Sequence, residues 1–340
     1  MTRAERRKAF WERNRKSGGY LLRKKIGKVL YSLGRAILVF GLCFLILQPL
    51  IQKVALSLMS DSDLYDRSVV LIPRHFSTQA FENAWRQFKG SNPTPWYTFW
   101  DSFKLSVAVG LFQTLSCTLV GYGFARFKFP LKKFFFGCVI LMLIVPPSTI
   151  ITPLYLYFQN FDIFGIIGAI KGDGKGLNML GSATPYLMMC ATCAGYKAGL
   201  YIYMMRQHFR NEPKELEEAA YVDGCGRLRT FFQILLPGAR PMMVSCFLFA
   251  FVWNWSDQVY MKVFFPTYKW SLVSTKLLGA ASTFDGENIA KYGQSYHTPE
   301  ATLNQLNAAA VLIALAPLLI IYVVAQKSFV ESISQSGIKG

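Results

Sequence analysis

Residues 211–237 read NEPKELEEAAYVDGCGRLRTFFQILLP, a polar stretch that lies between long apolar runs. Asn211 is a good helix N-cap, and the glutamates that follow it favour the positive end of a helix. These signals predict a helix over about 212–222. Gly224 is predicted to stop this helix, because glycine readily takes the left-handed conformation at a helix C-terminus. A second, amphipathic helix is predicted for the apolar residues that follow, with Pro237 at its end.

The spacing within this stretch matches a known signature. Glu218-Ala219-Ala220 is followed after three residues by Gly224, after nine more by Ile234, and one residue later by Leu236-Pro237. This is the EAA signature, and the chain resembles the permease subunits of binding-protein-dependent ABC importers that carry it. The resemblance covers about residues 36–340 and is to the MalG-like, sugar-transporting branch, whose C-terminus is similar to the tail of this chain.

The resemblance implies that the EAA stretch docks in a cleft of a separate ATPase. The residues implied to make or shape this contact are Glu217, Glu218, Ala219, Ala220, Asp223, Gly224, Ile234, Leu236 and Pro237. Alanine and glycine keep part of the surface shallow, so another protein can approach closely. The alternative is an amphipathic loop that only lies on the membrane, and the full match of the spacing argues against it.

Apolar residues make up 52% of this 340-residue chain, and they are grouped in blocks. Six blocks have the length of about 20 residues that crosses roughly 30 Å of hydrocarbon. They lie at about 36–58, 103–125, 134–157, 181–204, 240–262 and 308–326. We therefore predict an all-α polytopic membrane protein with six transmembrane helices. The resemblance implies the MalG-like fold of type I ABC importers.

The basic residues that produce the net charge of +18 are concentrated in the N-terminal arm and in the 126–133 and 205–239 loops, which all lie on one side of the predicted spans. Because basic loops stay in the cytoplasm, both termini are predicted to be cytoplasmic in a multi-pass protein of the cell membrane. The predicted parts are a basic arm (1–35), a permease domain (36–326) and a tail (327–340). Within the permease domain, external loops are predicted at about 59–102, 158–180 and 263–307, and the cytoplasmic EAA loop is predicted at 205–239. This placement of charge favours the lipid bilayer and not nucleic acid as the partner of the basic arm.

Polar and aromatic residues inside the predicted spans are candidates for a substrate path. They are Lys197, Trp253, Asn254, Trp255, Asp257 and Gln258. A lysine within a span is costly in lipid and indicates a functional site, unless it snorkels to the interface. Aromatic faces beside amide and carboxylate groups suit a sugar, whereas an interfacial aromatic belt is the structural alternative. For Lys197 and for the group at 253–258, the functional and the structural interpretation both stay open.

No pattern typical of an enzyme is present. The sequence has no ABC-type ATPase signature, and the glycine-rich segment 171–176 lacks the Ser or Thr and the first glycine of a phosphate loop. No span carries an HExxH, a GxSxG or paired aspartates, and the three histidines lie outside the spans. All seven cysteines fall in spans or in the cytoplasmic loop, so no external disulfide framework is predicted. We predict no catalytic residue, no metal site and no cofactor on this chain.

The resemblance implies an assembly with several partners. These are a second, MalF-like permease that completes a heterodimer, a cytoplasmic ABC ATPase dimer that binds ATP and Mg, and an external sugar-binding protein. The expected role is therefore a transport subunit for a saccharide. A non-sugar solute, such as a polyamine or a phosphonate, is the alternative. Residues 284–300 are interpreted as an insertion in the external loop that reaches the binding protein.

Overall fold

The computed structural model describes residues 11–66, 68–90, 92–163, 165–172, 174–265 and 271–337, and it describes side chains in these ranges except at 21 and 327–337. Every regular element in the described ranges is a helix, which confirms the predicted all-α class. The ends of the predicted basic arm (1–10) and tail (338–340) lie outside the described residues. The chain divides into two units, residues 1–76 and 77–340.

The first unit consists mainly of α2, Tyr20–Ser57. Its 22–57 segment is apolar and long enough to cross a membrane, and no residue of its most apolar 18-residue window is buried, whereas Ala55 and Ser57 near its end are. The helix includes the predicted span at 36–58 but starts earlier, so residues 20–35 of the predicted arm continue the same helix. A short helix, α3 (Asp61–Leu64), follows it.

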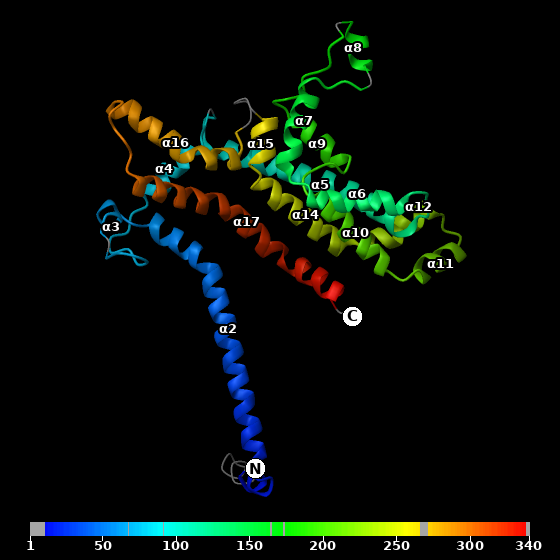
Figure 1. Cartoon of the computed structure of the whole chain (residues 1–340), viewed down its shortest axis with the longest axis horizontal. Helices are drawn as coiled ribbons and strands as arrows, with labels where there is room; N and C mark the ends of the chain where they lie inside the picture. The colour runs from blue at the N-terminus through cyan, green and yellow to red at the C-terminus, as the bar shows by residue number, and fades with distance from the viewer. Residues whose placement is uncertain are drawn as a thin grey trace. The chain divides into compact units, whose positions relative to one another are not determined.

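The second unit contains the remaining elements (Figure 1). They are α4 (Gln79–Gln87), α5 (Pro95–Arg126), α6 (Lys132–Ile144), α7 (Pro147–Gln159), α8 (Ile166–Lys171), α9 (Thr184–Ala191), α10 (Ala198–Asn211), α11 (Glu215–Val222), α12 (Arg227–Thr230), the π-helix η1 (Phe231–Leu235), α13 (Leu236–Gly238), α14 (Arg240–Trp255), α15 (Val259–Phe264), α16 (Val273–Tyr292) and α17 (Glu300–Gly337).

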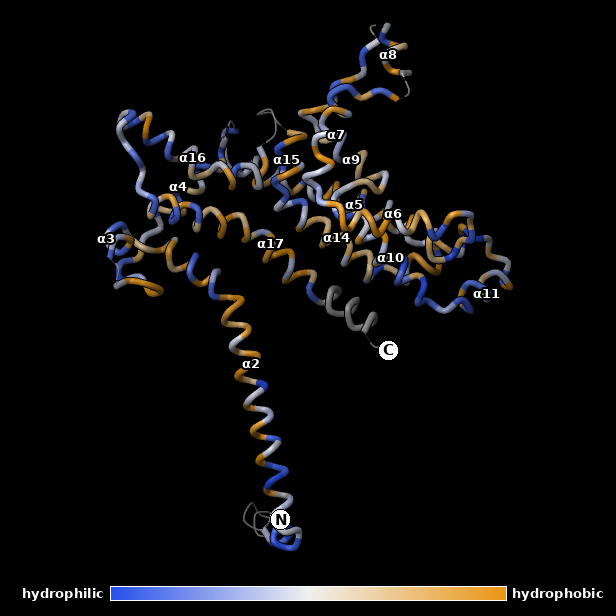
Figure 2. The backbone as a smooth tube through the Cα atoms, in the orientation of Figure 1, coloured by the Kyte–Doolittle hydropathy of each residue, from blue (hydrophilic) through white to orange (hydrophobic). Residues whose placement is uncertain are grey.

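Three described helices are long and apolar enough to cross a membrane, namely Leu22–Ser57, Pro95–Arg126 and Glu300–Gln326. Two pairs of helices, each bent at a short break, also meet this length and hydropathy criterion when each pair is counted as one span. The number of candidate spans is then five. The apolar character of α14 and α17 and the polar character of α11 are visible in Figure 2. The chain is therefore a polytopic helical protein with three to five candidate spans by this criterion, against the six predicted.

The predicted third span, 134–157, is bent by 104° between α6 and α7. The bend lies at Val145, which has an extended backbone with ψ of 121°, and at Pro146. A residue before proline is driven out of the helical region, and the next residue here is also a proline. The two prolines therefore divide the predicted span into two helices.

The predicted fourth span, 181–204, is not one helix. α9 ends at Ala191 and α10 begins at Ala198, and both Cys193 and Lys197 have positive φ angles, 59° and 62°. Such angles are uncommon outside glycine and interrupt an α-helix. Hydropathy counts apolar residues but does not detect such a break, so the prediction of a continuous helix was wrong here.

The predicted fifth span, 240–262, is divided in a similar way. α14 ends at Trp255, and α15 starts at Val259 after a short interruption. Asp257 accepts hydrogen bonds from the backbone N–H groups of Val259 (2.9 Å) and Tyr260 (3.2 Å). This carboxylate therefore satisfies donors at the start of α15, which otherwise have no partner within the helix.

The long helix α5 is the centre of the second unit, where it packs against α10 and α14 (Figure 1). A Cβ added at Gly121 would lie 2.6 Å from the Cβ of Met205 in α10. A Cβ added at Gly110 would lie 2.8 Å from the ring of Phe247 in α14. Both glycines therefore permit a close approach that any larger residue would prevent.

The predicted external loop at 263–307 contains a well-formed helix. α16 packs against α4 and α17, and Gln87 donates a hydrogen bond of 3.0 Å to Glu287. The first half of the presumed insertion, 284–300, continues α16 as far as Tyr292. Val273 and Ala280 of this helix pack into the same core as α17, and the external location of 263–307 stays a prediction.

Candidate functional site

The EAA stretch folds as a compact unit, and we call residues 212–238 the knuckle. Its first helix, α11, ends as predicted, because Gly224 takes the left-handed conformation with φ of 80°. The N–H of Gly224 donates to the carbonyl of Tyr221 (3.1 Å), and the N–H of Cys225 donates to the carbonyl of Ala220 (2.9 Å). These two bonds form a Schellman motif, which satisfies carbonyls at the helix end.

The start of the knuckle differs from the prediction. Asn211 is the last residue of α10 and not an N-cap, and α11 begins only at Glu215. Glu212 is extended, with ψ of 135°, since it precedes Pro213. Proline therefore separates two helices at this point and does not begin the second.

The second half of the knuckle ends close to the predicted place. α12, η1 and α13 form one helical run, Arg227–Gly238, which ends one residue after Pro237 and contains a π-helical turn that was not predicted. Pro237 has no N–H to donate within this run, and the π-helical turn lies directly before Leu236-Pro237. The chain then bends by 70° at Ala239, where α14 begins.

The signature residues divide between an outer and an inner face of the knuckle. Glu218, Ala219, Asp223 and Gly224 are exposed, and the first two belong to α11 itself. On the inner face Ala220 is buried, while Glu217, Ile234, Leu236 and Pro237 are half-buried. Val222 and Leu228 add apolar area to the outer face, with 87% and 76% of their surfaces exposed. The outer face therefore combines small, acidic and apolar groups.

An arginine outside the signature holds the knuckle in place. Arg126, the last residue of α5, donates a hydrogen bond of 2.9 Å from a terminal guanidinium nitrogen to the carbonyl of Glu212. Its Nε lies 2.6 Å from Oε1 of Glu217. Both side chains are nearly buried, and the contact is an ion pair without an aligned N–H···O hydrogen bond. The sequence signal for this tether is the basic residue that directly follows the predicted second span.

A histidine lies beside this tether. Nε2 of His208 is 3.6 Å from a carboxylate oxygen of Glu212. Burial lowers the pKa of His208, and the charge of Glu212 opposes this effect in part. The imidazole therefore favours its neutral form more than a solvent-exposed histidine does.

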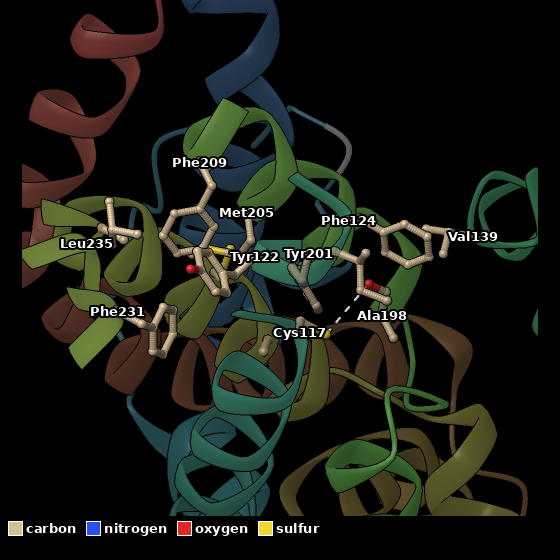
Figure 3. Close-up of a cluster of buried hydrophobic side chains, with 14 residues drawn as sticks. Cys117, Tyr122, Phe124, Val139, Ala198, Tyr201, Met205, Phe209, Phe231 and Leu235 are labelled. Atoms are coloured by element: carbon tan, nitrogen blue, oxygen red, sulfur yellow. Dashed lines mark hydrogen bonds between the residues drawn. The ribbon is translucent and has the colours of Figure 1, made fainter. Parts of the chain in front are cut away.

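Aromatic packing joins the knuckle to the long helices (Figure 3). The ring of Phe231 in η1 lies 4.5 Å from the ring of Tyr122 in α5, measured between centroids. Tyr122 also contacts Phe209 of α10 at 5.4 Å. Leu235 is buried in the same cluster. Because a close-packed cluster transmits displacement, the knuckle cannot move without α5 and α10.

The second candidate site is a pocket of about 490 Å³ beside the break in the predicted fourth span. One wall consists of Tyr196 and Lys197, and the other includes Pro146 and Pro147 at the bend of the third span. The structure therefore brings together the breaks of two predicted spans.

Lys197 is half-buried in this pocket and lies over two aromatic rings. Its Nζ is 5.1 Å from the ring centre of Trp253 and 5.3 Å from that of Tyr196. These are cation–π contacts. Within the described part of the chain, Lys197 has no ion pair with a carboxylate. Lys197 and Trp253, two of the predicted path residues, are thus adjacent.

The other predicted path residues lie elsewhere. Trp255 is buried in the core and donates a hydrogen bond of 3.1 Å from Nε1 to the carbonyl of Ala314. Asn254 is buried and accepts a bond of 2.9 Å from Ser106. Asp257 binds the start of α15, as described above, and Gln258 lines a separate, apolar pocket of about 150 Å³.

Side chains of α5 satisfy the backbone that the break between α9 and α10 leaves open. Gln113 donates a bond of 2.6 Å to the carbonyl of Tyr196, and Ser116 donates one of 2.7 Å to the carbonyl of Cys190. Broken helices persist at membrane depth only where such groups are satisfied by the protein or by water. Gln113 is not among the site residues predicted from the sequence, although a glutamine inside an apolar span is a usable signal.

In the described part of the chain, no group of His, Cys, Asp and Glu residues could hold a metal ion. The seven cysteines are all free. Neither candidate site therefore has the donor set of a metal centre or the cysteine pairing of a redox centre.

Comparison with known proteins identifies the family that these sites fit. Residues 118–335, more than half of the chain, match the family described as binding-protein-dependent transport system inner membrane component. The sn-glycerol-3-phosphate transport system permease protein UgpE of Yersinia pestis bv. Antiqua (strain Antiqua) is 26% identical over 295 residues, which cover 86% of this chain and 92% of that protein. The probable ABC transporter permease protein YurM of Bacillus subtilis (strain 168) is 24% identical over 292 residues, with coverage of 86% and 83%.

A solved structure has a similar fold. It is the crystal structure of a bacterial ABC transporter involved in the import of the acidic polysaccharide alginate. The likeness has a TM-score of 0.61 at 17% identity, and it covers 88% of this chain and 96% of that one. At this identity the likeness concerns the fold alone.

Proposed function

Because this chain belongs to the family of binding-protein-dependent transport system inner membrane components, we propose that it is the permease subunit of an ATP-driven importer for a saccharide. It is a multi-pass inner-membrane permease without catalytic chemistry or a cofactor of its own. A transporter of this family works with an ATPase and with a binding protein.

We propose six spans, with the broken pairs α9–α10 and α14–α15 as two of them. The chain would form one half of a translocation path, and a second, MalF-like permease would form the other. A cytoplasmic ATPase dimer would bind ATP and Mg, and an external sugar-binding protein would deliver the solute. The fold shared with the alginate importer supports this arrangement.

The observation that carries the coupling proposal is the division of the knuckle into two faces. The outer face offers Ala219, Gly224 and the exposed Val222 to a partner, while the inner face is tied to α5 by Arg126 and packed by Phe231. An ATPase that binds the outer face would therefore move α5 and α10 as its two halves close on ATP. Binding of the external protein would shift the same equilibrium, since such linkage is reciprocal.

The pocket at Lys197 would lie on the solute path. Its aromatic neighbours Tyr196 and Trp253 could stack against the C–H face of a sugar, and the ammonium group could bind hydroxyl or acidic oxygens. A cation in the pocket argues against a polyamine, because like charges repel. A phosphonate stays a valid alternative to a saccharide. The related permease UgpE belongs to an sn-glycerol-3-phosphate transport system, and the transporter with the similar fold is involved in the import of alginate. Both solutes are anionic.

The first test is purification of the tagged, full-length chain from its native membrane, with identification of the copurifying proteins. An ATPase, a second permease and an external binding protein are expected. The ligand of that binding protein, found by screening saccharides and phosphonates, would name the solute. Recovery of the chain alone, under conditions that preserve other membrane complexes, would contradict the importer assembly.

The second test addresses the pocket through transport of that solute. For an anionic solute, Lys197→Gln is expected to raise the solute concentration for half-maximal transport several-fold. Lys197→Arg is expected to keep this concentration close to that of the unmodified protein, because arginine is also a cation. Lys262→Gln, at the end of α15 and outside the pocket, serves as the matched control. Equal transport by all four proteins would exclude Lys197 from the path.

A further inference from the structure

A second basic site lies away from Lys197, where the end of α5 meets α6 and α10. A pocket of about 400 Å³ is lined there by six cationic side chains and by Phe124, Ala125 and Phe136. The cationic residues are Arg126, Lys132, Lys133, Arg206, Arg210 and Lys214. They come from three segments that are distant in the sequence, so only the fold gathers them.

The positive charge in this pocket is poorly compensated by the protein. Arg126 is paired with Glu217, but the other five cations form no ion pair within the described part of the chain. Lys132 donates a hydrogen bond of 2.8 Å to the carbonyl of Phe127, which leaves its charge unneutralised. Nε of Arg206 is buried and has no hydrogen-bond partner. A buried donor on a charged group is costly to leave unsatisfied, and a negative charge beside the guanidinium would offset part of this cost.

Electrostatic effects among these residues agree with this geometry. Burial, together with the charges of Arg206 and Arg210, lowers the pKa of Lys132. Burial and the charge of Arg210 also lower the pKa of Arg206. The cations therefore repel one another in the pocket, and a bound anion would relieve that repulsion.

The shape of the site selects a particular kind of anion. The guanidinium carbon of Arg206 lies 3.9 Å from the ring centre of Phe136, which fixes the plane of the guanidinium group. A fixed guanidinium with neighbouring lysines suits the oxygens of a phosphate group. On α6 beside the pocket, Phe134 and Phe135 expose 63% and 47% of their surfaces. Exposed aromatic rings next to a phosphate site suit a lipid whose acyl chains run alongside the protein.

We propose that this pocket binds a phosphate group at the cytoplasmic surface of the membrane, carried by an anionic phospholipid or by free phosphate. The exposed rings on α6 favour the phospholipid. The ligand would sit against Arg126, the residue that tethers the knuckle, and would thereby stabilise the junction of α5, α6 and α10. This site is separate from the solute pocket and does not depend on the identity of the solute.

The test is native mass spectrometry of the purified full-length chain, with the subunits that copurify, after addition of phosphatidylglycerol or phosphatidylcholine with the same acyl chains. Phosphatidylglycerol is expected to bind at least about tenfold more tightly, because each basic residue near the surface contributes to the attraction of anionic lipid. The double variant Arg206→Gln/Arg210→Gln is expected to lose this preference. The matched control Arg227→Gln/Arg229→Gln removes two exposed cations of α12 and is expected to keep it.

A second variant covers the case in which loss of Arg206 prevents folding. Arg210→Gln/Lys214→Gln changes two exposed side chains of the pocket and is expected to reduce the preference several-fold. Inorganic phosphate distinguishes the two sources of ligand, since displacement of the lipid by millimolar phosphate would assign the site to free phosphate, and retention of the lipid would assign it to the headgroup. Equal binding of both lipids to the unmodified protein, or an unchanged preference in both pocket variants, would overturn the proposal.

Discussion

The guanidinium Nε of Arg126, at the end of α5, lies 2.6 Å from a carboxylate oxygen of Glu217 in α11. The same guanidinium donates a hydrogen bond to the carbonyl of Glu212. One side chain thus connects α5 both to the first residue of the knuckle and to its first helix, α11. Loss of this side chain would leave a buried carboxylate and a carbonyl with fewer partners, so the contribution of the tether to stability can be measured.

Removal of the tether is expected to destabilise the purified protein. Arg126→Gln should reduce its stability by about 1–3 kcal/mol, the range for a buried hydrogen bond to a charged group. The measurement is thermal unfolding of the detergent-purified chain. Lys128→Gln, at an exposed position two residues further on, is the control and should unfold as the unmodified protein does. Equal unfolding of the two variants would show that the ion pair contributes nothing.

Gly224 is expected to tolerate few substitutions, because its φ is 80° although the space around it is open. Gly224→Ala should cost about 1–2 kcal/mol locally, the penalty of a left-handed conformation for an L-residue, and should reduce copurification of the ATPase. Gly224→Asn tests the cause, since asparagine tolerates this conformation but adds bulk. Copurification should recover with Asn if the backbone matters, and should stay low if the shallow surface matters.

The control for Gly224 is Gly286→Ala, which makes the same change inside the helix α16, with no atom near the added methyl group. It should leave the amount of copurifying ATPase unchanged. An unaltered yield of ATPase with both Gly224 variants would contradict the docking role of the outer face.

The backbone break between α9 and α10 is expected to depend on Gln113. Gln113→Ala removes the donor that lies 2.6 Å from the carbonyl of Tyr196, so a buried acceptor would lose its partner. The expected loss of stability is about 1–3 kcal/mol. Thermal unfolding should show a clear decrease for this variant and almost none for Gln233→Ala, an exposed glutamine of the knuckle. An equally small effect of both substitutions would mean that the break does not need Gln113.

The segment after α2 is expected to loosen in acid. Asp63 accepts hydrogen bonds from the backbone N–H groups of Arg74 (2.7 Å) and His75 (2.6 Å), and it contacts Nδ1 of His75 at 2.9 Å. These contacts with His75 and Arg74 lower the pKa of Asp63 below its ordinary value of 3.8, with the side chain of His75 as the largest cause. A carboxylate with a lowered pKa stabilises the folded state above its unfolded pKa, and this contribution is lost as the pH falls through the folded value.

Hydrogen exchange can measure this effect through the protection factors of the amides of Arg74 and His75, which divide out the intrinsic dependence on pH. Protection should be constant from pH 7 to about pH 5, where Asp63 stays ionised. It should then fall as the pH drops below 4. Asp63→Asn should give low protection at every pH. A decrease that is already complete above pH 5 in the unmodified protein would show that Asp63 is not its cause.

Local sequence signals predicted several features well. The end of α11 at Gly224 depends on the conformational freedom of that glycine. This property is local, so it could be predicted without the tertiary structure. The all-α class and the long spans at α5 and α17 follow from the length of the apolar runs, because a lipid environment demands that length. The EAA spacing identified the family, which the match over residues 118–335 confirms.

Other features could not be read from neighbouring residues. The break at residues 192–197 persists because Gln113 and Ser116, about 75 to 85 positions earlier in the chain, satisfy its carbonyls. The candidate path residues separate for a similar reason, since Trp253 faces Lys197 while Trp255, two residues later, is buried against α17. Successive residues of a helix point in different directions, so a sequence cluster does not become a spatial one.

The sequence by itself determined the class of the protein, the apolar runs that place it in a membrane, and the glycine that ends the first helix of the knuckle. Each depends on composition or on a few adjacent residues. The tertiary structure decided where the spans break, which signature residues face outward, and that Arg126 holds Glu217 while six cations surround one pocket. These features arise from contacts between residues far apart in the chain, and their energies exist only after the helices have packed.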